Sequence, residues 1–147
     1  MNIAGLDYNL SRKCLEIYIR GCKPPHCPGC HNKSLWQFDK KDNINFYKNI
    51  ISKKIKTGMV DEVWLLGGEP LDQNLIELEN FIKFLKTYSI KLWLWTRYEN
   101  CLNVPFLKYL DFIKTGAYDK NLPEYYIEAC DITLASSNQK IISLNYE

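Results

Sequence analysis

Three cysteines fall within nine residues of the segment RGCKPPHCPGCHN, residues 20–32. Cys22, Cys27 and Cys30 follow a C-x4-C-x2-C pattern, with His26 and His31 beside them. Closely spaced thiolates are typical ligands of metal ions and of iron–sulfur clusters. The segment therefore predicts a metal or redox site.

Three kinds of site are compatible with this spacing. A structural zinc site would recruit His26 or His31 as a fourth ligand, but zinc ligands usually come as two separated pairs, and no second pair follows. A thioredoxin-like pair at Cys27 and Cys30 leaves Cys22 without a role. A [4Fe-4S] cluster uses all three thiolates and leaves one iron open to a ligand.

A second segment of chemical interest is Gly67-Gly68-Glu69-Pro70, about forty residues further along the chain. Paired glycines let backbone approach a ligand closely and can leave N–H and C=O groups free to bind it. Alone, such a turn is most simply structural. After a three-cysteine loop, it indicates a ligand site.

Both segments follow predicted strands. The alternation of Leu15, Ile17 and Ile19 predicts a strand ending at the cysteines, and apolar runs predict further strands over 63–66 and 91–96. Helical spacing predicts helices over 45–57 and 75–85. In a parallel α/β sheet, the carboxyl ends of the strands share one edge, so the cysteine loop, the GGEP turn and Thr96-Arg97 are expected on one rim.

The rest of the chain is simpler. A short helix is expected over 105–110, before the apolar pair Phe112 and Ile113, and one last strand or hairpin is expected within 132–144. Trp93 and Trp95 are expected in the core, and the run Lys53, Lys54 and Lys56 on a solvated helix face. No linker is visible, which predicts one domain over 1-147.

The composition indicates which kinds of protein and partner are compatible with this chain. A chain of 147 residues with 46% apolar residues can bury a core, and a net charge of +2 does not favour a nucleic-acid partner. Without a long apolar run or signal segment, we expect a soluble, cytoplasmic protein with no membrane partner. The separate cysteines are expected to be small core residues: Cys14, Cys101 and Cys130.

These motifs resemble those of the radical S-adenosylmethionine (SAM) enzymes, which carry a three-cysteine loop after their first strand and a GGEP-type turn after their second. More narrowly, the chain is similar to the activating proteins of anaerobic (class III) ribonucleoside-triphosphate reductase. The likeness runs from about residue 15 to residue 142, through the cysteine loop, LLGGEPL, LWTRY, LDFIKTGAY and SSNQKII.

The resemblance implies a single radical SAM domain of the α/β class, an incomplete (βα) barrel of about five or six mostly parallel strands. It implies an oxidoreductase in which Cys22, Cys27 and Cys30 hold a [4Fe-4S] cluster and SAM chelates the open iron. One electron would cleave SAM into methionine and a 5′-deoxyadenosyl radical. That radical would generate a glycyl radical on the reductase.

The resemblance also assigns the residues around SAM. Gly29 and His31 match positions on the adenine side, and Gly67, Gly68 and Glu69 match the turn that receives the methionine amino group. Thr96 is placed where a hydroxyl reaches the carboxylate or ribose. Arg97 is expected either to pair with the carboxylate or to face solvent, and His26 is expected to face solvent.

Two features depart from the family pattern. The usual spacing is C-x3-C-x2-C, so one extra residue precedes Cys27 and lengthens the loop by at most about 3.3–3.6 Å. A small residue is expected where Arg97 follows Thr96. Both departures indicate a divergent subgroup.

The expected partners are the large subunit of the anaerobic reductase, as protein substrate, and a one-electron donor such as flavodoxin or ferredoxin. Two alternatives stay open at this point. One is a radical SAM activase or synthase that acts on another target, and the other is a non-catalytic iron–sulfur or zinc-binding module.

Overall fold

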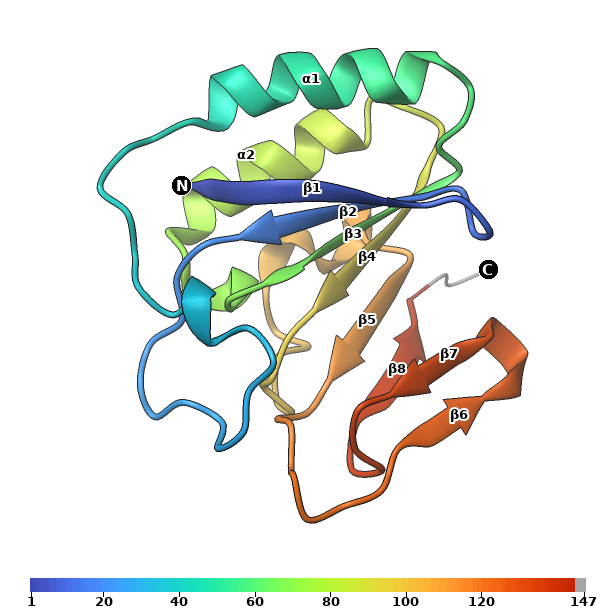
Figure 1. Cartoon of the computed structure of the whole chain (residues 1–147). Coiled ribbons are helices and arrows are strands. Elements are labelled where there is room, and N and C mark those ends of the chain that lie inside the picture. The colour runs from blue at the N-terminus through green and yellow to red at the C-terminus, as the bar shows by residue number, and fades with distance from the viewer. Residues whose placement is uncertain (145–147) are drawn as a thin grey trace.

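The computed structural model describes residues 1–144, which form a six-stranded sheet, a two-stranded sheet and two α-helices (Figure 1). The large sheet contains β1 Ile3–Asn9, β2 Cys14–Ile19, β3 Glu62–Gly67, β4 Lys91–Trp95, β5 Phe112–Thr115 and β8 Lys140–Ser143. The small sheet contains β6 Tyr125–Ile127 and β7 Ile132–Leu134. The helices are α1 Ile44–Lys56 and α2 Leu75–Leu85, and 3-10 turns cover η1 Lys33–Leu35, η2 Pro70–Asp72, η3 Pro105–Tyr109 and η4 Glu128–Cys130.

The large sheet is mostly parallel, with the order β1-β2-β3-β4-β5-β8. β2, β3, β4 and β5 run parallel to one another, whereas β1 and β8 pair antiparallel at the two edges. The predicted α/β class and parallel sheet are confirmed. The pairings of the described strands do not close a barrel, and the incomplete barrel stays a prediction.

Both helices cover the same face of the sheet (Figure 1). Asn74 caps α2 by accepting hydrogen bonds from the N–H groups of Ile76 and Glu77, and Gly58, with φ +78°, follows the end of α1 as predicted. Among residues 1–144, no helix is both long and apolar enough to cross a membrane.

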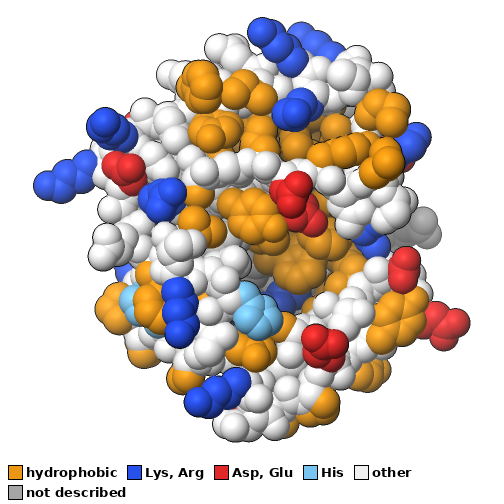
Figure 2. Space-filling view, in the orientation of Figure 1, with side chains coloured by type: hydrophobic (Ala, Val, Ile, Leu, Met, Phe, Trp, Pro, Cys, Tyr) orange, Lys and Arg blue, Asp and Glu red, His pale blue; other side chains and the backbone are white. Residues whose placement is uncertain are grey.

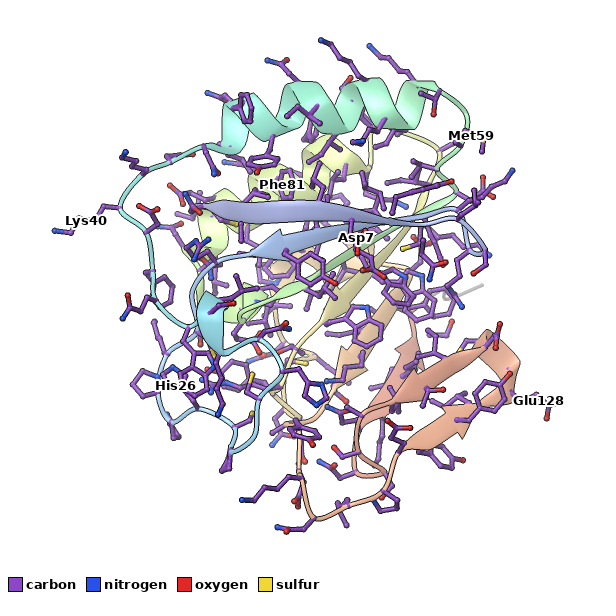
Figure 3. All side chains as sticks on the ribbon, in the orientation of Figure 1. Asp7, His26, Lys40, Met59, Phe81 and Glu128 are labelled. Carbon is purple, nitrogen blue, oxygen red and sulfur yellow. The ribbon has the colours of Figure 1, made fainter. Side chains whose placement is uncertain are left out.

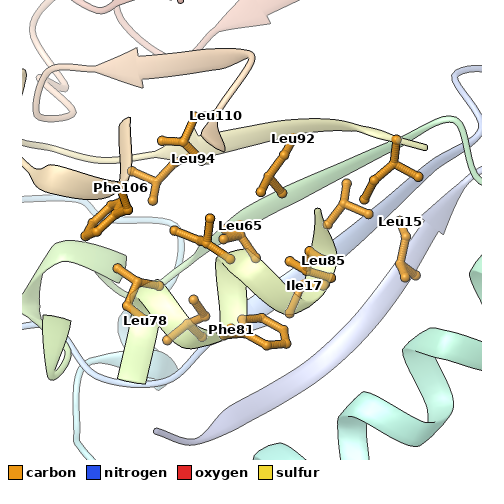
Figure 4. Close-up of a cluster of buried hydrophobic side chains, with 14 of the residues drawn as sticks. Leu15, Ile17, Leu65, Leu78, Phe81, Leu85, Leu92, Leu94, Phe106 and Leu110 are labelled. Atoms are coloured by element: carbon orange, nitrogen blue, oxygen red, sulfur yellow. The ribbon is translucent and has the colours of Figure 1, made fainter. Parts of the chain in front are cut away.

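The main core lies between the helices and this face (Figure 4). Each fully buried aliphatic or aromatic side chain contributes roughly 1.5–3 kcal/mol, so this layer fixes the strands that carry the site. Its fully buried members include Ile17, Leu65, Leu78, Phe81, Leu85, Leu94 and Phe106.

The opposite face of the sheet carries a second, smaller core. Trp64 and Trp93 pack there with Ile132 and Leu134 of the β6–β7 hairpin, which confirms Trp93 as a core residue. The hairpin covers only part of this face. The space-filling view shows a hollow with a hydrophobic floor between the hairpin and the sheet edge (Figure 2).

Three predictions about strands need correction. β1 was not predicted, because Gly5 and Asp7 interrupt its alternation and most of this edge strand is not buried. The cysteine loop therefore follows the second strand, not the first. β6 was not predicted either. The segment 132–144, expected to hold one last strand or hairpin, contains two strands, β7 and β8, but they do not form a hairpin: β7 pairs with β6 and β8 with β5, in different sheets. The predicted domain 1-147 includes residues 145–147, which lie outside the described part.

Candidate active site

The carboxyl ends of β2, β3, β4 and β5 surround a pocket of about 160 Å³. The cysteine loop, the double-glycine turn and the end of β4 all line it, as predicted from the strand order. The predicted residues that line the pocket are Cys22, Cys27, Cys30, Gly67, Gly68, Glu69, Thr96 and Arg97. Other lining residues are Asn32, Trp36, Leu66, Trp95, Lys114, Gly116, Tyr118 and Gln139.

The three loop cysteines are free thiols in different environments. Cys22 is buried directly after β2, whereas Cys27 and Cys30 are half-buried. Burial raises the pKa of the Cys22 thiol to about 11, and the nearby Arg97 guanidinium acts in the opposite direction. The Asn32 N–H group donates to the Cys30 sulfur over 3.3 Å.

This donor set fits an iron–sulfur cluster. Within residues 1–144, no three side chains of His, Cys, Asp or Glu converge closely enough to share one metal ion. A [4Fe-4S] cluster makes no such demand, because each thiolate binds a different iron. The three free thiols around the pocket match in number the protein ligands of a cluster with one open iron, and their assignment as its ligands stays a prediction.

The loop segment between Cys22 and Cys27 is hydrogen-bonded to Arg97, which follows β4, and to Asp72 in the turn after β3. The Lys23 N–H group donates to the Asp72 carboxylate at 2.7 Å. The Arg97 guanidinium donates to the carbonyl groups of Lys23, at 2.6 Å, and of Pro25. Arg97 therefore does not face solvent, and a bond from it to a substrate carboxylate stays a prediction.

His26 was expected to face solvent, and that prediction is wrong. Its ring is half-buried and stacks on Trp36, with the ring centroids 4.0 Å apart, and its Nε2 atom lies 2.8 Å from the Cys22 carbonyl oxygen. Figure 3 shows His26 within the loop, away from both helices. The stack forms because the chain turns back at η1 and places Trp36 beside His26. The local sequence does not indicate this contact.

The double glycine is required by the close approach of two chain segments. Gly67 has φ +115°, and a Cβ atom there would lie 2.7 Å from the Ile19 backbone. A Cβ atom on Gly68 would lie 2.5 Å from the Gly21 carbonyl oxygen, which itself accepts the Glu69 N–H at 2.8 Å. The turn thus packs directly on the start of the cysteine loop. The predicted contacts of both glycines with SAM stay predictions.

Glu69 is buried, and its carboxylate is bonded within the chain. It accepts hydrogen bonds from the N–H groups of Leu71 (3.0 Å) and Arg97 (2.8 Å) and from the Thr96 hydroxyl (2.7 Å). Burial raises the pKa of Glu69, while these donors act in the opposite direction. The predicted role of Glu69 toward the methionine amino group, and of Thr96 toward the carboxylate or ribose, stays a prediction.

Two other predicted residues lie outside the pocket wall. Gly29 and His31 are exposed on the loop. The His31 ring lies 4.9 Å from the ring of Tyr118, which lines the pocket. Their predicted place on the adenine side stays a prediction.

Lys114 lines the pocket and was missed in the sequence. It lies within β5 at 8% exposure, and its ammonium group donates to the Gly116 carbonyl at 3.0 Å. Burial lowers the pKa of Lys114 to about 8, against the opposing effect of Glu69. The signal in the sequence that could have identified it is a lysine within the apolar segment FIKT, because lysine is rarely buried in a strand.

A groove of about 400 Å³ adjoins the pocket and shares Cys27, Arg97 and Tyr118 with it. Sites for small ligands usually enclose about 300–1,000 Å³, so the pocket and groove together suit a ligand of SAM's size better than the pocket alone. The groove is lined mainly by apolar side chains, among them Pro24, Pro25, Pro28, Tyr98 and Ala117.

Comparison with known proteins shows the family of this chain and its cofactor. The family described as "4Fe-4S single cluster domain" matches residues 12–142, which confirms the predicted cluster as cofactor. The anaerobic ribonucleoside-triphosphate reductase-activating protein of Enterobacteria phage T4 is 34% identical over 73% of this chain and 72% of its own length. The 7-carboxy-7-deazaguanine synthase of Buchnera aphidicola subsp. Schizaphis graminum (strain Sg) is 29% identical over 52% of this chain and 42% of its own. No solved structure matches significantly.

Proposed function

We propose a function that follows from family membership: this chain belongs to the anaerobic ribonucleoside-triphosphate reductase-activating proteins and to the 4Fe-4S single cluster domain family. The protein generates a glycyl radical on the large subunit of an anaerobic ribonucleoside-triphosphate reductase. When bound, the cluster and SAM would supply the chemistry: one electron would cleave SAM into methionine and a 5′-deoxyadenosyl radical, which would take a hydrogen atom from the glycine. The main support is the meeting of three thiols and the double-glycine turn at one pocket.

The chain's own residues bind and orient the two cofactors. The thiolates of Cys22, Cys27 and Cys30 hold the cluster. Lys114 supplies a buried positive charge for the carboxylate of SAM, because an ammonium group with spare donors favours an anionic partner in a low-dielectric pocket. The contacts predicted for Gly29, His31, Gly67, Gly68, Glu69 and Thr96 belong to the same proposal.

The finer features of fold and setting are also part of the proposal. The mostly parallel sheet is the incomplete barrel of the radical SAM type, with SAM on the face opposite the helices. The protein works in the cytoplasm, where thiols stay reduced, and all six of its cysteines are free. A flavodoxin or ferredoxin delivers the electron, and neither nucleic acid nor a membrane takes part.

Anaerobic reconstitution tests this function. The purified chain is incubated with iron and sulfide, reduced with dithionite and mixed with SAM, and 5′-deoxyadenosine is quantified by chromatography. We expect Cys27→Ala to abolish 5′-deoxyadenosine formation. The matched control is Cys130→Ala, which changes a half-buried thiol outside the pocket and should leave formation unchanged. Full cleavage by Cys27→Ala would refute the cluster assignment.

The protein substrate is tested separately. Mixing the reduced, SAM-loaded protein with the large subunit of an anaerobic reductase should give the electron paramagnetic resonance doublet of a glycyl radical. Cleavage of SAM without that signal would favour the alternative of another radical SAM target, to which the weaker match with a synthase also points.

A further inference from the structure

Arg97 joins the two segments on which the site depends. Its backbone N–H group donates to the Glu69 carboxylate at 2.8 Å, and its guanidinium reaches the carbonyl groups of Lys23 and Pro25 in the cysteine loop. These loop residues lie more than seventy positions away in the sequence. One residue thus fixes the loop relative to the GGEP turn.

The loop needs such an external partner. Pro24 and Pro25 have no N–H groups, so this segment has few donors with which to close a turn of its own. The carbonyl groups before and after Pro24 instead accept hydrogen bonds from Arg97. A guanidinium is suited to this task because its planar fork presents several N–H donors in fixed directions.

Two side chains hold the guanidinium in place. The Asp72 carboxylate lies 3.3 Å from it, is 4% exposed, and also accepts the Lys23 N–H at 2.7 Å. The Tyr98 hydroxyl lies 3.2 Å from the guanidinium and donates to Asp72. The network therefore pairs the charges of Arg97 and Asp72, and these two side chains bind both the carbonyl and the N–H group of Lys23. Linked contacts of this kind are more rigid than separate ones.

We propose that Arg97 is a positioning residue that clamps the extra length of the C-x4-C loop through two carbonyl groups, with Asp72 and Tyr98 orienting its guanidinium. The inference rests on the proposed function, since the loop is taken to hold the cluster. It assigns the two departures from the family pattern, the added loop residue and Arg97, to one device. A longer loop has more conformations, so its three thiols keep fixed relative positions only if a contact from outside the loop holds its backbone.

The first test uses the apoprotein and needs no activity. Hydrogen–deuterium exchange of the Lys23 amide and alkylation of Cys27 are measured by mass spectrometry for the wild type, Arg97→Gln, Arg97→Lys and Tyr98→Phe. Loss of the two carbonyl contacts should speed exchange and alkylation roughly tenfold in Arg97→Gln. Arg97→Lys should resemble Arg97→Gln, because an ammonium cannot serve both carbonyl groups in fork geometry. Tyr98→Phe should give a smaller change in the same direction.

Arg12→Gln is the matched control. Arg12 is 19% exposed against 14% for Arg97, and it also binds a carboxylate, Glu62, and backbone carbonyl groups, those of Cys130 and Asp131. It lies at the opposite end of the sheet, so its loss should lower global stability without altering the loop. The clamp would be overturned if Arg97→Gln showed the same Lys23 exchange and Cys27 alkylation rates as the wild type or as Arg12→Gln. Wild-type rates in Arg97→Lys would overturn it as well.

The second test uses the reconstituted protein. Arg97→Gln should bind less iron and sulfide per chain and shift the electron paramagnetic resonance spectrum of the reduced cluster, whereas Arg12→Gln should do neither. A wild type that lacks a [4Fe-4S] cluster or does not cleave SAM would refute the proposed function, while the exchange result would still report on the clamp. An assembled wild type with an unchanged Arg97→Gln spectrum and iron content would refute the clamp alone.

Discussion

Thr96 donates its hydroxyl hydrogen bond to the Glu69 carboxylate over 2.7 Å, which ties the end of β4 to the turn after β3. Both residues are 2% exposed. The Thr96 oxygen also accepts the Tyr98 N–H at 3.1 Å, so the hydroxyl is bonded on two sides. These contacts hold together the wall of the pocket on which the proposed ligand contacts depend.

Thr96→Val should destabilise the apoprotein by about 2 kcal/mol. Valine keeps the shape of threonine but removes a donor from a buried carboxylate, which then loses part of its compensation for desolvation. Thr96→Ser retains the hydroxyl and is the control. Urea unfolding under anaerobic, reducing conditions measures the difference, and equal stability of the two variants would contradict the role assigned to the bond.

Gly68→Ala should cost roughly 2–4 kcal/mol of stability and lower the iron content after reconstitution. The new Cβ atom would lie 2.5 Å from the Gly21 carbonyl oxygen, so the start of the cysteine loop must move. Gly5→Ala is the control, because nothing lies within 4 Å of its Cβ position. We expect Gly5→Ala to change stability by less than about 1 kcal/mol. A similar loss in both variants would argue against close packing of Gly68 on Gly21.

Lys114→Met should stabilise the apoprotein at pH 7 by about 3 kcal/mol. Burial lowers the pKa of Lys114 to about 8 from 10.5, and each unit corresponds to about 1.4 kcal/mol. Between pH 8 and 10.5 the folded state binds fewer protons than the unfolded state, so wild-type stability rises with pH across this window. The advantage of the variant should therefore be complete below about pH 8 and be lost toward pH 10.5.

Denaturant unfolding at pH 7 and pH 10 measures this effect. Lys140→Met, at an exposed position on the neighbouring strand β8, is the control and should change stability by about 0.5 kcal/mol or less. The Lys114→Met protein should also bind SAM more weakly. A variant that is less stable than the wild type at pH 7 would show that the buried charge is compensated in the fold.

Alkylation of the apoprotein should distinguish the cysteines by burial. Iodoacetamide near neutral pH should label Cys27 and Cys30, which are half-buried, at least tenfold faster than Cys14, which is fully buried. Burial raises the pKa of the Cys14 thiol, which further lowers its thiolate fraction. Peptide mass spectrometry follows the order, and in urea all positions should react at similar rates. Rapid native labelling of Cys14 would contradict its place in the second core.

Much of the site could be predicted because its residues follow strands with strong periodicity. The run Val63 to Leu66 and the alternation before Cys22 placed two segments at strand ends, and parallel strands bring such ends to one edge. β1 and β6 were not predicted because β1 is an edge strand and β6 is short, and both show only weak alternation of apolar and polar residues. The periodicity of apolar residues reflects burial of one face of a strand, and few residues of these two strands are buried.

The sequence by itself determined the chemical groups and their order along the chain: three thiols in the loop after β2, a double glycine at the end of β3 and a threonine after β4. It did not indicate what Arg97 and Lys114 contact, and for His26 it wrongly predicted exposure to solvent. Those contacts were decided only by the tertiary structure, because they join segments distant in the chain, as Arg97 joins Lys23 and Pro25. Residue spacing encodes which face of an element is buried, whereas a polar side chain takes whichever partner the packed elements bring within hydrogen-bond reach.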